Sequence, residues 1–148
     1  MRATAVACAL LLAGCVPHPV GPARTYAKYE GKAVTTAESA VSAVQTARLV
    51  VETAAKGNAT ATFTAMLLSE QEESLSGLQG TFGSIQPPDE RADDLRDELG
   101  ELLGDAADHV STLRIIARRG QLDDLAEEAK PLDEDLRGLH AFAEEHGS

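Results

Sequence analysis

Apolar residues recur at alternating spacings of three and four from Tyr26 onward, and no stretch alternates in the way that a half-buried strand does. This spacing places apolar side chains on one face of a helix. Aromatic residues make up only 3% of the 148-residue chain, and tryptophan is absent from it. The core must therefore be built from leucine, valine and alanine, and we predict an all-α fold.

Three short interruptions divide this region into four helices. Gly57 is a helix-ending glycine and Asn58 a suitable N-cap, Pro87-Pro88 stops one helix and opens the next, and Gly120 caps the third. The predicted helices cover residues 26–56, 59–85, 88–119 and 122–146. Short connections make neighbours antiparallel, which predicts an elongated up-down-up-down four-helix bundle over residues 26–148. A three-helix bundle with a partly disordered second segment is the alternative.

Each predicted helix has an apolar seam, and the spacing resembles the seven-residue repeat of a coiled coil. The seam of the first helix is Val34, Ala37, Val41, Val44, Val51 and Ala55, broken by Arg48 and widened by Leu49 and Val50, and that of the second is Phe63, Met66, Leu67, Leu75, Leu78 and Phe82. The third seam is Ala92, Leu95, Leu99, Leu102, Ala106, His109, Leu113 and Ile116, widened by Leu103, Val110 and Ile115. The fourth is Leu122, Leu125, Ala129, Leu132, Leu136, Leu139 and Ala143. Glycines 77, 80 and 83 predict fraying or a kink late in the second helix. Because the leucine spacing continues across Pro131, we expect a kink near Glu127 rather than two separate helices.

The N-terminus has the features of a secretory signal. A positive charge at Arg2 precedes an apolar run from Ala3 to Ala13, which is too short to span a bilayer of about 30 Å as a helix. The run ends in Leu12-Ala13-Gly14-Cys15, a tetrapeptide that resembles the lipobox of bacterial lipoproteins. The resemblance implies alkylation of the Cys15 thiol by a diacylglyceryl group, whose acyl chains include palmitate, and cleavage between Gly14 and Cys15. An ordinary signal peptide with a coincidental cysteine is the alternative.

Cleavage at this position predicts a signal peptide over residues 1–14. Residues 15–25 would then form a lipidated cysteine followed by a proline-rich tether. Membrane lipid is then one partner, since two acyl chains anchor a protein far more firmly than one. We expect the domain to stand on the extracytoplasmic face of the cell membrane. With Cys8 removed and Cys15 acylated, no thiol remains for a disulfide or a thiolate metal site.

Charge constrains the other partners. The chain has 13 basic and 24 acidic side chains, a formal net charge of −11, which argues against nucleic acid as a partner. Residues 121–148 alone carry nine acidic and two basic side chains, so the last helix offers an acidic face for a basic protein partner. We expect Arg114, Arg118 and Arg119 to pair with acids of that helix.

No catalytic residue, metal site or cofactor is predicted. The Glu-x-x-His spacing of metal-binding bundles does not occur, and Cys-x-x-Cys-His is missing. His109 shares a helix face with Asp105, and His140 shares one with Glu144, and we expect ordinary structural roles for both histidines. The acidic pairs lack a calcium-binding loop and are predicted to be solvated. Gly100-x-x-x-Gly104 predicts a close helix contact within the bundle.

The segment Ser84-Ile85-Gln86-Pro87-Pro88-Asp89-Glu90, leading into a leucine-spaced helix, resembles uncharacterised secreted helical proteins of actinobacterial type. That resemblance implies no activity and no site. The sequence favours a lipid-anchored bundle that acts by protein contact or as an envelope scaffold, without catalysis. Two alternatives remain: a bundle that binds a small apolar or metal ligand near His109 or Pro131, and an enzyme with polar groups converging among His109, Asp105 and Arg48.

Overall fold

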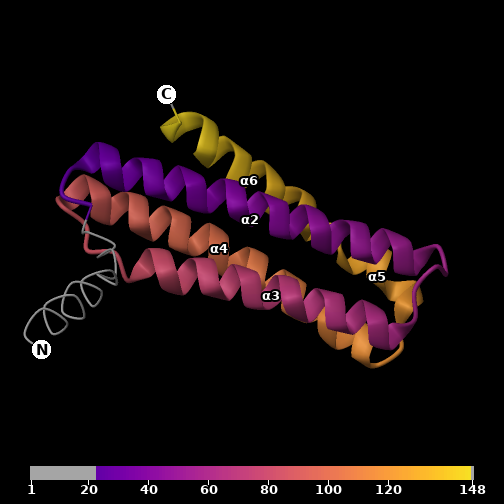
Figure 1. Ribbon diagram of the computed structural model, residues 1–148. Helices are drawn as coiled ribbons and strands as arrows, with labels where there is room; N and C mark the ends of the chain where they lie inside the picture. Colours follow the sequence, from indigo (N-terminus) through magenta and orange to yellow (C-terminus); the bar gives the residue numbers. More distant parts are fainter. Residues whose placement is uncertain (1–22, 148) are drawn as a thin grey trace, which may run out of the picture.

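The computed structural model describes residues 23–147, which are all-helical apart from short connections and contain no strand. Within these residues five helices pack together, and a single turn of 3-10 helix precedes the fourth of them. Figure 1 shows three long helices, α2, α3 and α4, side by side with the chain reversing direction at each end. The predicted signal peptide, Gly14, Cys15 and most of the predicted tether lie outside the described residues.

Helix α2, Tyr26–Ala55, forms as predicted to within one residue. Its end is closed by Gly57, whose φ of 74° allows the Asn58 amide to donate to the carbonyl of Thr53 and the Gly57 amide to that of Ala54. Its buried face is wider than the predicted seam and is rich in alanine, whereas Arg48 and Ala55 are exposed. The alanines let the neighbouring helices approach α2 closely.

Helix α3, Ala61–Gly83, differs from the prediction in its N-cap and in its continuity. Its N-cap is Thr60, whose hydroxyl accepts from the Phe63 amide at 3.3 Å, and not Asn58. The helix is continuous through Gly77 and Gly80, where we expected fraying. Because Leu75 and Phe82 are buried on either side of these glycines, tertiary packing compensates for their low helix propensity.

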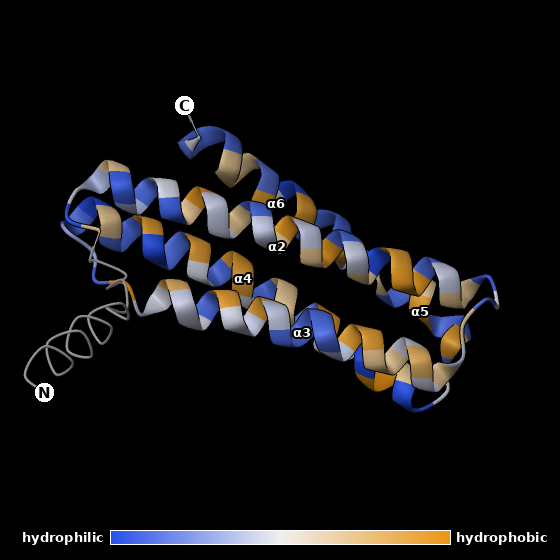
Figure 2. Cartoon of the chain, viewed as in Figure 1, coloured by the Kyte–Doolittle hydropathy of each residue, from blue (hydrophilic) through white to orange (hydrophobic). Residues whose placement is uncertain are grey.

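The first turns of α3 also face differently from the prediction. Phe63 and Met66, expected in the core, are 49% and 50% exposed, and Thr64, Ala65 and Leu68 are buried instead. Figure 2 shows α3 apolar on its visible face in these first turns and hydrophilic midway along. The alternative with a partly disordered second segment is wrong, since α3 is a complete helix that packs on both α2 and α4.

Helix α4, Glu90–Arg118, begins at the N-cap Asp89, whose carboxylate accepts from the Ala92 amide at 3.1 Å. It ends in a second glycine cap, Gly120, with φ 77°. The close helix contact predicted at the two glycines of α4 does not form among the described residues: a Cβ added at Gly100 would meet nothing within 4 Å, and one added at Gly104 would meet only the Gln79 side chain, at 3.4 Å. Gln79 of α3 instead reaches across and donates to the Gly100 carbonyl at 3.2 Å.

The apolar face of α4 is rotated from the predicted seam. Leu103, Val110 and Ala117 are fully buried, while Leu102, His109 and Ile116 lie half-buried at its edge. The buried positions from Ala92 to Ala117 advance 25 residues in seven steps, close to the 3.6 residues per turn of a straight helix. The prediction placed Leu103 and Val110 beside the seam instead of at its centre, because it imposed the 3.5-residue period of a coiled coil, which drifts by about 20° per heptad on a straight helix.

The last segment is divided, contrary to the prediction of one kinked helix. A 3-10 turn, η2 (Leu122–Asp124), leads into the one-turn helix α5 (Leu125–Glu128), and α6 follows from Pro131 to His146. Pro131 occupies the first turn of α6, where its missing amide costs nothing. The leucine spacing continues across the break because Leu125, Leu132, Leu136 and Leu139 all enter the same core.

Helix α6 packs on α2 and α4, as α3 does, so α3 and α6 lie on opposite sides of the α2–α4 pair. An aromatic contact joins α2 to α3, with the rings of Tyr29 and Phe82 centred 5.1 Å apart. Within residues 23–147, no helix has the length and apolar character needed to cross a membrane.

Candidate functional site

The η2–α5–α6 segment carries the acidic surface that the sequence predicts. The segment has nine carboxylates, and all of them are exposed except that of Asp135. The exposed carboxylates are those of Asp123, Asp124, Glu127, Glu128, Asp133, Glu134, Glu144 and Glu145. A partner can therefore reach this surface without any rearrangement of the helices.

Three of these carboxylates are paired within the chain. Arg48 of α2 reaches Asp133 at 2.9 Å, Lys130 reaches Glu127 at 2.5 Å, and Arg137 lies 3.5 Å from Glu134. The groups in these pairs are about half exposed or more, so each pair contributes little to stability. The remaining exposed acids have no ion pair among the described residues, which leaves the surface negative.

The buried member of the set, Asp135, lies opposite His109. The Nδ1 atom of His109 is 2.8 Å from the Asp135 Oδ2 atom, and this links α4 to α6. The carboxyl side chain is 6% exposed and the imidazole 38%. Burial raises the pKa of Asp135, and the hydrogen bond and charge of His109 oppose that rise.

This pairing corrects the expectation for His109, which we placed beside Asp105 on its own helix. Asp105 acts on Asp135 only through its negative charge, which further raises the pKa of that carboxyl. The hydrogen bond between the Asp135 carboxylate and the Nδ1 atom fixes the orientation of the imidazole ring. The arrangement is therefore a structural link between α4 and α6.

The polar groups considered for an enzyme do not converge. Arg48 contacts Asp133, whereas His109 contacts Asp135, and these two carboxylates, two residues apart on α6, pair with α2 and α4 respectively. Among residues 23–147, no three His, Cys, Asp or Glu side chains gather closely enough to hold a metal ion. His140 is exposed.

The remaining histidine, His146, closes the C-terminal end of α6 onto the start of α2. Its Nδ1 atom lies 3.4 Å from Glu30 Oε1, and its ring is 4.7 Å from that of Phe142. The sequence contained no signal for this contact, because Glu30 and His146 are 116 residues apart.

The arginines near the end of α4 do not pair with the last segment as expected. Arg114 instead donates two hydrogen bonds to Glu72 of α3. This contact holds the pKa of Glu72 below its ordinary value. Arg118 and Arg119 are exposed and make no ion pair within residues 23–147. Arg114 and Arg118 thus lie on the α3 side of α4.

No protein-family model, curated protein or solved structure gives a significant match to this chain. A function for this chain must therefore be inferred from its residues and their geometry.

Proposed function

We propose that this chain is a lipoprotein, anchored by acylated Cys15 on the extracytoplasmic face of the cell membrane, whose helical domain contacts another protein. The anchor is supported by the tetrapeptide Leu12-Ala13-Gly14-Cys15 at the end of an apolar run. Catalysis and a resident cofactor form no part of the proposal. The helical domain is proposed to be an up-down-up-down four-helix bundle in which η2, α5 and α6 together count as the fourth member.

The position of the acidic segment supports a role in protein contact. The chain enters the domain at Ala23, beside the start of α2, and α2 extends 30 residues, or about 45 Å, from there. Asp123, Asp124, Glu127 and Glu128 lie between the end of α4 and the start of α6, at the opposite end of the domain in Figure 1. An anchored molecule would hold these carboxylates away from the lipid.

The observation that carries the proposal is this group of exposed carboxylates, of which only Glu127 has an ion-pair partner among the described residues. A surface whose charges have one sign attracts and orients a partner whose charges have the opposite sign, and mainly increases the rate of association. We propose a basic protein as that partner.

Neutralising this segment is expected to reduce capture of the partner in cells. The variant Asp123→Asn, Asp124→Asn, Glu127→Gln, Glu128→Gln removes four negative charges from one end of the domain. In vivo crosslinking followed by mass spectrometry should show loss of a basic protein that the unmodified chain captures. Because each group is exposed, the thermal unfolding of the variant should change little.

A matched variant separates local charge from net charge. Glu70→Gln, Glu73→Gln, Asp94→Asn, Glu101→Gln also removes four exposed carboxylates, from α3 and α4. It should retain the crosslinked partner. Equal capture by both variants, or equal loss in both, would contradict the proposal.

A further inference from the structure

A groove of about 440 Å³ lies between the first half of α3 and the last turns of α4. Ala61, Ala65 and Met66 line it from α3, and Arg114, Ala117 and Arg118 line it from α4. Its volume lies within the range of about 300–1,000 Å³ that is usual for small-molecule sites. It is separate from the acidic segment and plays no part in the proposed protein contact.

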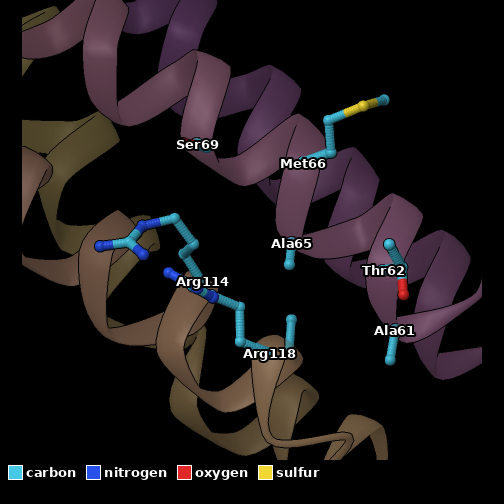
Figure 3. Close-up of a pocket in the computed structure, with 8 residues that line it drawn as sticks. Ala61, Thr62, Ala65, Met66, Ser69, Arg114 and Arg118 are labelled. Atoms are coloured by element: carbon cyan, nitrogen blue, oxygen red, sulfur yellow. The ribbon is translucent and has the colours of Figure 1, made fainter.

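The base of the groove is apolar. Ala65 and Ala117 are buried, and small side chains at both positions leave room between the helices. Met66 of α3 is half exposed, and in Figure 3 its side chain points away from Arg114 and Arg118.

The charge of the groove is opposite to that of the molecule. No acidic residue is among those that line it, although the chain carries 24 acids. Arg114 is held by Glu72, whereas Arg118 has no ion pair in the described part of the chain. Figure 3 shows both arginine side chains on the α4 side, with that of Arg118 extending toward Arg114. The groove therefore presents one available guanidinium beside an apolar floor.

We propose that this groove binds a single-chain anionic amphiphile, a medium-length alkyl carboxylate. The carboxylate would accept hydrogen bonds from the Arg118 guanidinium. The alkyl chain would lie along Ala65 and Ala117 toward Ala61. From Ser69 to Ala61 the α3 side extends about 12 Å, at about 1.5 Å per residue. That length suits an extended chain of medium length, whereas a docked protein helix would extend well beyond it.

The test is a titration of the full chain, carrying Cys15→Ser so that it is not acylated, with dodecanoate below its micellar concentration. Isothermal titration calorimetry should give one site per chain, and amide NMR shifts should be concentrated at Ala61, Ala65 and Ala117. Dodecyltrimethylammonium has the same alkyl chain with a positive head group, and butanoate has the head group with a short chain. Both should bind at least about tenfold more weakly, since each lacks one of the two interactions.

Arg118→Gln should weaken dodecanoate binding about tenfold, because it removes one charge-assisted hydrogen-bond donor. Arg119→Gln is the matched control, since Arg119 is adjacent and exposed but does not line the groove, and its binding should stay within about twofold. The proposal is overturned if dodecanoate does not bind, if the cationic amphiphile binds equally, or if both arginine variants lose affinity equally. Binding of an acidic amphipathic peptide without binding of dodecanoate would also overturn it, in favour of a protein ligand.

Discussion

Replacing Leu103 with alanine is expected to lower the free energy of unfolding by about 3 kcal/mol, within the usual range of about 2–5 kcal/mol for a buried leucine. Leu103 is fully buried at the centre of α4, a helix that packs on α2, α3 and α6. Truncation removes apolar contacts and leaves a cavity that the surrounding helices fill only partly. Urea unfolding monitored by circular dichroism measures the loss.

Leu102→Ala is the matched control for Leu103→Ala, because it makes the same change one residue away at a half-buried position. Leu102 lies at the edge of the core and contacts α6 at Gly138. The contact is close, since a Cβ added to Gly138 would lie 2.9 Å from the Leu102 Cδ2 atom. We expect Leu102→Ala to lower the free energy of unfolding by about half as much as Leu103→Ala does. The coiled-coil spacing predicts the reverse order, so a larger loss at Leu102 would contradict the orientation of α4 described above.

Replacing His109 with alanine is expected to cost about 1–3 kcal/mol at about pH 8, because it leaves the Asp135 carboxylate buried without its partner. The cost should be smaller near pH 4. Burial already raises the pKa of Asp135, and removal of the opposing interactions with His109 raises it further. A carboxyl with a raised pKa in the folded state loses stabilising free energy as the pH rises through that value. Urea unfolding at several pH values measures this dependence.

Two controls isolate the ion pair. His140→Ala removes an exposed histidine from α6 and should alter neither the stability nor its pH dependence. In the double variant His109→Ala, Asp135→Asn, the buried group no longer titrates, so the additional pH dependence should disappear. An equal cost for His109→Ala at about pH 4 and about pH 8 would show that the carboxylate charge plays no part.

Much of the fold can be predicted from the sequence because helix periods and caps are local properties. Gly57 and Gly120 end their helices with positive φ, as a glycine cap requires, and three of the four predicted helices form with their ends shifted by at most two residues. The direction of each apolar face was less predictable. Phe63 and Met66 satisfy a helical spacing yet lie outside, since a local pattern does not specify where neighbouring helices pack.

The polar contacts depend on pairs that are distant along the chain. Asp135 follows His109 by 26 residues, and Arg114 follows Glu72 by 42, so neither partner is visible at helical spacing. One signal was available: Asp135 stands between Leu132 and Leu139 on the apolar face of α6, and a buried acid there requires a partner. The break at Pro131 was misjudged because continuous leucine spacing is compatible with a divided helix.

The central claim is that Cys15 anchors this domain in a membrane. Metabolic labelling with a palmitate analogue, followed by purification of the chain, tests it most directly by comparing the unmodified protein with Cys15→Ser. We predict that the unmodified protein takes up the label and that Cys15→Ser takes up none. Equal labelling of the two proteins, or no labelling of either, would contradict the claim.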